Sequence, residues 1–327
     1  MKTLILTAEE IKKIITVEEV ISAVENAFAF HAKKMTLMPV KVYLPLEKYQ
    51  GDFRAMPAYV EGSAGVKWVN AHPRNPEKGL FPSVMAVLIY SDPATGFPLA
   101  IMDATIITNY RTGAAGVIAS KYLARKNSCT LGLIGCGKQA ETQLLFHNEI
   151  FKFDKVCVVD KSNEQIERFV AQFSQLGLEK STHERVAGCD ILCTTTPSHS
   201  PIVRAEWIKP GTHINAIGAD ALGKEELDPL ILKNAKIVID DYEQATRSGE
   251  INVPLSQGII EEKDIYASIG EIVAGLKPGR VNNKEITVFD STGLAIQDIA
   301  VARLLYEKAK KLKIGRKIGT EVNLVGI

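Results

Sequence analysis

The sequence predicts an α/β protein that combines a doubly wound parallel sheet with a second, α+β domain. From about residue 129 onward, short apolar runs alternate with helical stretches, which is typical of a parallel sheet covered on both faces. The segment 135–140, Gly-Cys-Gly-Lys-Gln-Ala, follows the first of these runs directly and opens a helical stretch. Between about residues 37 and 103 the apolar runs are instead separated by Pro, Gly and Asp, which predicts a mainly antiparallel sheet.

The size and composition are those of an ordinary globular protein with two domains. The chain has 327 residues, of which 46% are hydrophobic and 24% charged, and its net charge is +1. This balance gives no electrostatic reason to expect a nucleic-acid or membrane-surface partner. No run approaches the roughly 18 apolar residues that cross a bilayer. The apolar core of the N-terminal segment is too short for a signal peptide.

The cysteines predict reduced, mostly buried thiols in a cytoplasmic protein. Their number is odd, no two form a Cys-x-x-Cys pair, and no histidine stands at metal-ligand spacing to them. We therefore expect no metal site. The five cysteines are Cys129, Cys136, Cys157, Cys189 and Cys193.

The first domain is expected to begin with helices and to continue into the antiparallel sheet. Segments 7–10 and 16–19, TAEE and TVEE, match the capping box that starts helices. After the second box, apolar residues recur at helical spacing and predict an amphipathic helix. Segment 108–126 is rich in small residues and predicts the helix that closes this domain. The helical core positions are Val17, Val20, Ile21, Val24, Ala27 and Phe28, and the strand-like runs are VKVYL, FRAMPAYV, GVKWVN, SVMAVLIY and LAIMD.

Six apolar runs predict the strands of the second domain, and six is the number in a doubly wound dinucleotide fold. A long amphipathic helix follows the last run and is expected to pack back on the first domain. The six runs are LGLI at 131–134, VCVVD at 156–160, DILCTTT at 190–196, HINAIG at 213–218, KIVID at 236–240 and ITVFD at 286–290.

The glycine-rich segment predicts a dinucleotide site. Gly135 permits a tight turn, Gly137 lets the backbone approach a pyrophosphate, and Ala140 allows close packing of helix on sheet. The following helix offers free N–H groups and a positive dipole end to the phosphates. Asp160 ends the next run, where it would accept hydrogen bonds from the adenosine ribose and repel a 2′-phosphate, which favours NAD over NADP. Lys161 weakens this preference, and a doubly wound domain without a nucleotide remains the alternative.

Two further segments fall where loops would face a bound ligand. Segment 194–198, Thr-Thr-Thr-Pro-Ser, ends one predicted strand, and Asp220 follows another. The carboxyl ends of parallel strands form the ligand-binding edge of such a sheet. Ordinary turn chemistry is the alternative for the threonines, and a solvated loop carboxylate is the alternative for Asp220.

Basic residues recur among the apolar residues of the first domain. Lys67 lies within GVKWVN, Lys41 within VKVYL and Arg54 within FRAMPAYV. One such residue is typical of an edge strand whose lysine faces water. Several on successive strands, with Arg111 at the start of RTGAAG, indicate instead a pocket for an anion, since arginine binds a carboxylate through two parallel hydrogen bonds.

Six segments resemble the ornithine cyclodeaminase/mu-crystallin family, and the similarity runs from end to end. It implies a substrate-binding and dimerisation domain at residues 1–118 and 295–327, an NAD-binding Rossmann domain at 119–294, and homodimers. FRAMPA and GEINVPLSQGII are most like the archaeal-type alanine dehydrogenases of the family. Phe81 departs from the family pattern, which would shift the loop beside the site. The segments are GVKWVNAHPRNPEKGLFPSVMAVLIYSDPATGFPLAIMDAT, RTGAA, GLIGCGKQA, TTTPS, INAIGAD and DSTGLAIQD.

The resemblance also implies roles for individual residues. Lys67 would be the active-site lysine and Asp220 the catalytic carboxylate. Lys41, Arg54 and Arg111 would surround the carboxylate of the substrate. The residues implied in cofactor binding are Ser83, Arg111, Thr112, Gly135, Gly137, Lys138, Gln139, Asp160, Thr195, Thr196, Ser198, Ile217, Gly218, Lys224 and Ser291.

These roles predict the oxidation of a small amino acid by NAD. A partly desolvated lysine near other cations has a lowered pKa, which suits proton transfer near neutral pH. L-Alanine would bind by its carboxylate, lose a proton from its amine and give up a hydride from Cα. Asp220 would then assist the attack of water on the imine, which yields pyruvate and ammonia. Ornithine cyclodeamination, imine reduction and nucleotide binding without turnover remain the alternatives, although no group for the distal ammonium of ornithine is apparent near Met56 and Ala58.

Overall fold

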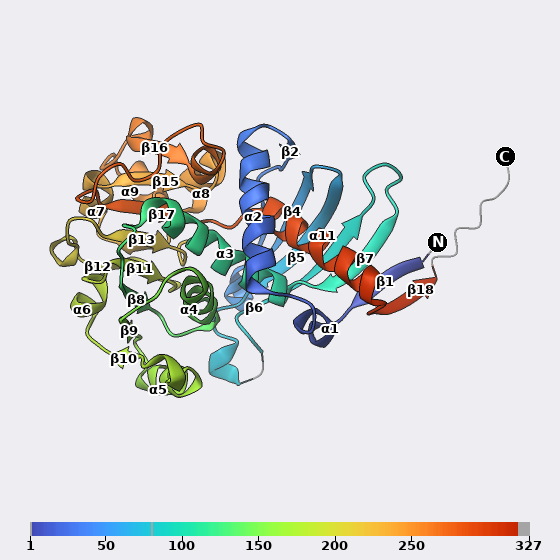
Figure 1. The fold of residues 1–327 in the computed structure, drawn as a ribbon, viewed down its shortest axis with the longest axis horizontal. Coiled ribbons are helices and arrows are strands. Elements are labelled where there is room, and N and C mark those ends of the chain that lie inside the picture. Colours follow the sequence, from blue (N-terminus) through green and yellow to red (C-terminus); the bar gives the residue numbers. More distant parts are fainter. Residues whose placement is uncertain (1, 80, 320–327) are drawn as a thin grey trace. The chain divides into compact units, whose positions relative to one another are not determined.

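The computed structural model describes residues 2–79 and 81–319 and divides into two compact units (Figure 1). The part of the chain up to Arg111 and from Ala295 onward forms the first unit, and Thr112–Leu294 forms the second. The boundary near residue 111 lies inside one helix, α3 (Thr105–Leu123). The first unit is therefore built from two distant parts of the chain.

The first unit contains a mixed sheet in which β1 and β7 are the parallel neighbours and the other pairs are antiparallel. The strand order is β18-β1-β7-β6-β5-β4-β2, and β3 pairs with β4. The prediction of a mainly antiparallel sheet is therefore confirmed. The strands are β1 (Lys2–Leu6), β2 (Thr36–Leu37), β3 (Val42–Leu46), β4 (Gly51–Val60), β5 (Ser63–Ala71), β6 (Val84–Ser91), β7 (Pro98–Asp103) and β18 (Arg316–Gly319).

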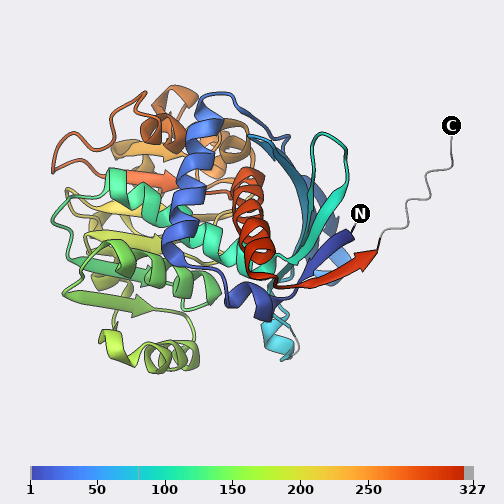
Figure 2. The same cartoon turned by 45° about the vertical axis from the view of Figure 1, so that its right-hand side comes forward.

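Two long helices pack on one face of this sheet (Figure 2). Helix α2 (Val17–Ala32) begins after Thr16, whose hydroxyl accepts a hydrogen bond from the backbone N–H of Glu19. Helix α11 (Ala295–Leu312) packs against α2 and against β4, β5 and β6. The short helix α1 (Ala8–Lys12) begins with the predicted capping box. The apolar stripe of α2 is buried as predicted at Val20, Ile21, Val24, Ala27 and Phe28, whereas Val17, in the first turn, is only half-buried.

The strand β5 lies in the middle of the sheet, between β4 and β6. Lys67 pairs with Met56 of β4, and Val69 pairs with Arg54, so all four side chains point to the same face. That face is buried, whereas Trp68 on the opposite face is 45% exposed. The alternation therefore places Lys67 on the side of the sheet that α11 covers.

The second unit contains a parallel sheet with the order β10-β9-β8-β11-β13-β17-β15-β16. The chain goes from β8 to β9 on one side and later to β11 on the other, so the doubly wound arrangement is confirmed. The six predicted runs form the inner strands, and the sequence did not indicate the outermost two, β10 and β16. The strands are β8 (Thr130–Ile134), β9 (Lys155–Val159), β10 (Glu179–Lys180), β11 (Ile191–Thr194), β13 (His213–Ala216), β15 (Lys236–Ile239), β16 (Ile265–Ser268) and β17 (Thr287–Asp290), with β12 (His199–Val203) and β14 (Glu225–Leu227) in a small separate sheet.

Helices cover both faces of the parallel sheet, which explains its continuous apolar runs. In β9, Val156 and Val158 pack with α4 and α5 in one buried cluster, while Cys157 and Val159 pack with α6 and α7 in another. The remaining helices are α4 (Lys138–Ile150), α5 (Asn163–Gln172), α6 (His183–Ala187), α7 (Pro229–Asn234), α8 (Tyr242–Ser248), α9 (Asn252–Ser256) and α10 (Ile269–Val273).

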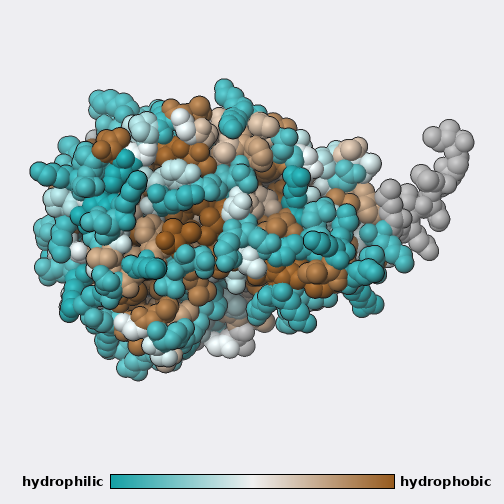
Figure 3. All heavy atoms as spheres, in the orientation of Figure 1, coloured by the Kyte–Doolittle hydropathy of each residue, from teal (hydrophilic) through white to brown (hydrophobic). Residues whose placement is uncertain are grey.

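The face of the molecule seen in Figure 3 is largely hydrophilic and most of the cysteines are buried, as expected for a globular protein of this composition. Hydrophilic side chains spread over much of the face in Figure 3, with hydrophobic ones in separate patches. The five cysteines are free thiols; four are buried, which fits the prediction of mostly buried thiols, and Cys129 is partly exposed. Among residues 2–79 and 81–319, no helix combines the length and apolar character needed to cross a membrane.

Candidate active site

The side chain of Lys67, which belongs to the first unit, is completely buried. It is 0% exposed and lies on a central strand, facing α11. The alternative of an edge-strand lysine that faces water is therefore wrong. Because a buried ammonium is costly unless it is paired, the partners of Lys67 define the candidate site.

Asp298, in the first turn of α11, is the ionic partner of Lys67. The Lys67 Nζ lies 2.7 Å from Asp298 Oδ2, and Arg111 Nε donates to Oδ1 of the same carboxylate at 3.2 Å. Arg111 Nη1 also donates to Gln297 Oε1 at 3.2 Å. The positive end of the α11 dipole further stabilises a negative charge at this position. One buried carboxylate therefore lies between two buried cations.

These surroundings lower the pKa of Lys67 from 10.5 to about 7. Burial is the largest cause, because a low-dielectric environment disfavours the charged form. The ion pair with Asp298 raises the pKa, whereas the charges of Arg111 and Lys41 lower it. A lysine with this pKa gains and loses its proton in the neutral range, which suits a general acid or base.

Arg54 lies on the same face of the sheet as Lys67 but forms its own ion pair. Its Nε and Nη2 donate to the two carboxylate oxygens of Asp52, at 2.7 and 3.1 Å. Lys41 is buried and close enough to Lys67 to lower the pKa of that lysine. The structure therefore brings Lys41 and Arg111 to Lys67, while the guanidinium of Arg54 is engaged by Asp52.

The glycine-rich loop after β8 leaves room for a ligand at the start of α4. Gly135 has a φ of +96°, and a Cβ there would lie 2.7 Å from Thr195 Oγ1. At Gly137, the N-cap of α4, no atom lies within 4 Å of the position of a Cβ. Ala140 is completely buried, so the helix packs closely on the sheet. This open space in front of free helical N–H groups fits a pyrophosphate.

Asp160, which follows β9, is oriented by two backbone groups. Its Oδ2 accepts from Cys136 N at 2.8 Å, and its Oδ1 accepts from Ser162 N at 2.9 Å. Each carboxylate oxygen can accept a second hydrogen bond. The half-buried carboxylate is therefore held beside the glycine-rich loop and retains capacity for a ribose hydroxyl.

Other predicted cofactor residues lie at the carboxyl ends of the strands. Thr195 Oγ1 donates to Ile134 O at 3.1 Å, and Ile217 N donates to Thr194 O at 3.0 Å. Ser291 follows β17 and is buried, and its Oγ has no hydrogen-bond partner within the described part of the chain. A buried hydroxyl without a partner is rare in folded proteins, so the Ser291 hydroxyl is suited to form a hydrogen bond with a bound molecule.

The remaining candidates are spread over both units. Lys138 and Gln139 open α4, and Ser198 is half-buried just before β12. Thr112 is buried at the start of the second unit, and its carbonyl oxygen accepts a hydrogen bond from a glutamine of α4. Ser83 is half-buried in the first unit, before β6.

Phe81 lies in the loop before β6. Phe81 is 59% exposed. Its neighbour Leu80 lies outside the described residues. The predicted shift of this loop therefore stays a prediction.

Asp220 lies in the loop after β13 and pairs with Lys224. The Lys224 Nζ donates to Asp220 Oδ1 at 2.7 Å. Asn252 of α9 fixes the end of this loop, because its Nδ2 donates to Lys224 O and its Oδ1 accepts from Gly223 N, both at 3.0 Å. Asp220 and Lys224, which are both predicted site residues, therefore form an ion pair with each other.

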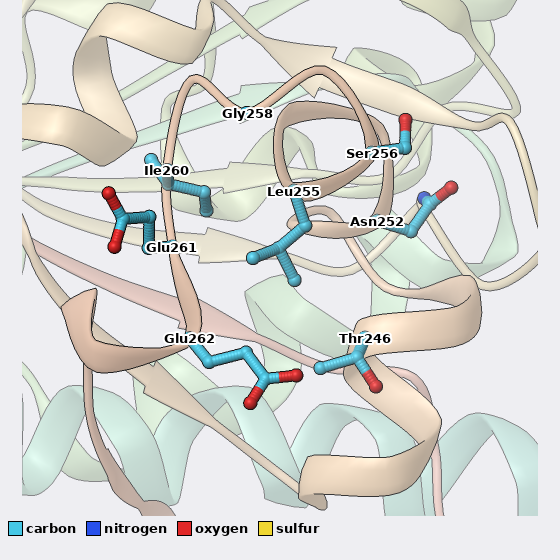
Figure 4. A pocket seen from close by; sticks show the side chains of 8 residues that line it. All are labelled: Thr246, Asn252, Leu255, Ser256, Gly258, Ile260, Glu261 and Glu262. Atoms are coloured by element: carbon cyan, nitrogen blue, oxygen red, sulfur yellow. The ribbon is translucent and has the colours of Figure 1, made fainter.

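An open hollow of about 480 Å³ lies beside Asn252 in the second unit (Figure 4). None of the residues predicted to bind substrate or cofactor lines it. Its charged groups are two carboxylates, which do not suit an anionic substrate. Among the described residues, no three His, Cys, Asp or Glu side chains are grouped so that they could hold a metal ion. The hollow is lined by Thr246, Asn252, Leu255, Ser256, Gly258, Ile260, Glu261 and Glu262.

Comparison with known proteins identifies the family. The family model described as "Ornithine cyclodeaminase/mu-crystallin family" matches residues 1–313. The chain belongs to the ornithine cyclodeaminase/mu-crystallin family.

Relatives within this family differ in the reactions that their names state. The alanine dehydrogenase of Archaeoglobus fulgidus is 55% identical over 320 residues, which cover 97% of this chain and 98% of that protein. A Δ1-pyrroline-2-carboxylate reductase of Bacillus cereus is 34% identical over 325 residues, covering 96% and 99% of the two chains.

Solved structures of the family superpose closely. An archaeal alanine dehydrogenase dimer with bound NAD has a TM-score of 0.94 at 54% identity, covering 98% of this chain and 99% of that one. The Δ1-pyrroline-2-carboxylate reductase of Thermococcus litoralis, in complex with NADH and L-proline, has a TM-score of 0.93 at 40% identity, covering 97% and 100%. The predicted fold class is therefore confirmed.

Asp298 and Gln297 were not among the site residues expected from the sequence. The segment DSTGLAIQD carried the resemblance, but no role was assigned within its helical part. A signal was present, because Asp298 stands at helical spacing to Val301, Ala302 and Leu305, which are all buried. An acidic residue on the buried stripe of an amphipathic helix needs a cationic partner.

Proposed function

We propose that the protein is an NAD-dependent dehydrogenase that converts L-alanine reversibly to pyruvate and ammonia. The observation that carries this proposal is the 55% identity, over 97% of the chain, to the alanine dehydrogenase of Archaeoglobus fulgidus. The buried cluster of Lys67, Asp298 and Arg111 supports it. The cluster combines positive charge for a carboxylate with a lysine whose pKa is about 7.

NAD is the proposed cofactor, and residues of the second unit fit it. The open space at Gly137, the start of α4 and the unpaired hydroxyl of Ser291 suit a dinucleotide. Asp160 would accept hydrogen bonds from the ribose and repel a 2′-phosphate, which favours NAD over NADP. NAD, when bound, supplies the acceptor for the hydride from the substrate. Further candidate contacts in this unit are Thr112, Gly135, Lys138, Gln139, Thr195, Thr196, Ser198, Ile217, Gly218 and Lys224.

The first unit is proposed to bind the amino acid and accept its proton. Arg111 and Lys41 would attract the carboxylate, and the Arg111 fork would orient it. Lys67, in its neutral form, would take a proton from the substrate ammonium, because the nitrogen needs a free electron pair before Cα can release a hydride. Asp298 would hold both Lys67 and Arg111 in place through its two oxygens.

Asp220 is proposed to act in the hydrolysis of the imine. It would accept a proton from water while the water oxygen bonds to the imine carbon, and the carbon–nitrogen bond would then break to release ammonia. The ion pair with Lys224 and the clamp by Asn252 would keep the carboxylate in a fixed loop. A fixed base loses less entropy in the transition state than a mobile one.

We expect the purified protein to form NADH steadily from NAD and L-alanine, and not from NAD and L-ornithine. A dehydrogenase accumulates NADH, whereas a cyclodeaminase regenerates its cofactor, so absorbance at the NADH wavelength separates the two. Δ1-Pyrroline-2-carboxylate with NADH is the third arm, because reductases of that substrate are 34% and 40% identical to this chain. If the protein consumed NADH with Δ1-pyrroline-2-carboxylate and formed none from alanine, its function would be that of an imine reductase and not of an alanine dehydrogenase.

The protein is also proposed to form homodimers through the outer face of the first sheet. On this face Trp68 pairs with Val87 of β6 and with Ala55 of β4, and Ala55 pairs with Val42 of β3. Trp68, Val87 and Val42 are 45%, 50% and 62% exposed. A continuous exposed apolar surface is typical of a protein–protein interface, and the archaeal alanine dehydrogenase structure is a dimer.

Trp68→Lys is expected to convert the dimer into a monomer of unchanged fold. The change removes an aromatic contact and places an unpaired ammonium in an apolar interface, which costs several kcal/mol. Sedimentation velocity measures the result. Val281→Lys is the matched control, because Val281 is 63% exposed in the second unit. A Trp68→Lys protein that remained dimeric would assign the interface to another surface.

The proposed cellular setting is the cytoplasm. The five cysteines carry free thiols, and reduced cysteines are the rule in that compartment. The proposed partners are small molecules and a second copy of the chain, without nucleic acid or membrane.

A further inference from the structure

We propose that the buried carboxylate of Glu226 is a positioning residue that holds the loops after β11 and β13 together and thereby sets the affinity for NAD. The inference rests on the proposed cofactor. Glu226 lies on β14 and is completely buried.

Glu226 accepts four hydrogen bonds, from the end of β11 and from the loops after β11 and β13. Its Oε1 accepts from the backbone N–H and from the hydroxyl of Thr196, both at 2.7 Å. Its Oε2 accepts from Thr194 Oγ1 at 2.7 Å and from Gly218 N at 3.0 Å. Each oxygen therefore receives one backbone N–H, and the two N–H groups belong to different loops.

The two loops touch at Gly218, so Glu226 has no substitute there. A Cβ on Gly218 would lie 2.1 Å from Thr196 O and 2.7 Å from Glu226 Oε2. No side chain fits between the loops, and only an acceptor reaching in from β14 satisfies both N–H groups. Because hydrogen bonds to a charged acceptor are the stronger kind, one carboxylate fixes the distance between the loops.

A second buried carboxylate, that of Glu250, binds the backbone of β14 and not the loops. Its Oε1 accepts from Glu226 N at 2.9 Å and from Leu227 N at 2.7 Å, so it fixes the backbone of β14. Burial and the neighbouring Glu226 raise the pKa of Glu250 well above 4.5. The pKa of Glu226 is raised as well, because burial outweighs its four hydrogen bonds, which lower the pKa. Glu250 therefore supports the strand, and Glu226 supports the loops.

The supported loops lie where a cofactor binds in a doubly wound sheet. Thr196 and Gly218 follow the carboxyl ends of β11 and β13, which form the ligand-binding edge of such sheets. If the loops separate, only a fraction of the protein has the arrangement that accepts NAD. The apparent dissociation constant then rises in inverse proportion to that fraction.

The test compares Glu226→Gln with Glu250→Gln. Glutamine keeps the size of Glu226, but in either orientation its NH2 group faces a backbone N–H, of Thr196 or of Gly218. We expect the Kd and KM for NAD to rise about tenfold, which corresponds to about 1.4 kcal/mol, with the KM for alanine unchanged. Glu250→Gln keeps the Oε1 acceptor, so its Kd for NAD should stay within about twofold of the original value.

Three outcomes would overturn the role of Glu226. These are an unchanged Kd in Glu226→Gln, equal changes in both variants, or a loss confined to kcat. If Glu226→Gln fails to fold, Thr194→Val replaces it, because it removes one donor from Oε2 and should raise the Kd for NAD in the same direction. A Thr194→Val protein with the original Kd would then overturn the role. Absence of NAD binding in the unmodified protein would instead overturn the proposed function itself.

Discussion

Replacing Lys67 by methionine is expected to lower kcat/KM for L-alanine by about 10³-fold, within the range of general acid–base catalysis, while NAD still binds with its original affinity. Methionine fills the buried space of the lysine stem but cannot accept a proton. The glycine-rich loop, Asp160 and Ser291, which fit the dinucleotide, lie in the second unit, away from β5 in the chain. Steady-state kinetics with alanine and a direct titration with NAD measure the two quantities.

The pH profile adds a second test of Lys67. As the pH falls through about 7, Lys67 becomes protonated and can no longer accept the substrate proton, so kcat/KM for alanine oxidation should fall. We call this fall of kcat/KM below about pH 7 the acidic limb of the pH profile. The Lys67→Met protein should lose the acidic limb together with most of its activity. Lys48→Met, at an exposed position of the same unit, is the control and should keep both. Near-normal turnover in Lys67→Met would show that another group accepts the proton.

Replacing Asp298 by asparagine is expected to lower the free energy of unfolding by about 3 kcal/mol, because it leaves two buried cations without their carboxylate. Both Lys67 and Arg111 contact this one side chain. Asp298 raises the pKa of Lys67, so its removal lowers that pKa below about 7. The acidic limb of the pH profile should accordingly move to lower pH. Urea unfolding and the pH dependence of kcat/KM measure the two effects.

Asp52→Asn is the matched comparison for Asp298→Asn. It removes the carboxylate partner of Arg54 in the same sheet, but Asp52 is partly exposed and does not contact Lys67. Its acidic limb should stay at about pH 7. If both variants moved the limb equally, the shift would reflect the general charge of the unit and not the pair of Lys67 with Asp298.

Most of the fold was predictable because its patterns are local. Continuous apolar runs marked the inner strands of the parallel sheet, and capping residues marked α1 and α2. The outermost strands β10 and β16 were missed for a physical reason. β10 contains only Glu179 and Lys180, which are both exposed, and an edge strand of that length leaves no periodic signal.

The candidate site was less predictable because its contacts join distant residues. The run GVKWVN is compatible with an edge strand or a central one, and the position of β5 decides between them only when β4 and β6 are in place. The partner of Lys67 lies on α11, near the other end of the sequence. The sequence did not indicate a role for Glu226 either, because this role depends on the positions of two loops of the second unit in space.

The split composition of the first unit has a consequence for biosynthesis. Its strands β1 to β7 leave the ribosome early, whereas α11 emerges only after the whole of Thr112–Leu294. Until α11 has been synthesised, β4, β5 and β6 lack this covering helix. The ammonium of Lys67 then has no carboxylate partner, so its burial away from water would be costly. Domains generally fold as units during synthesis, so the continuous second unit can mature on the nascent chain while the first waits. The group proposed to move protons is thus assembled only after the second unit has been synthesised.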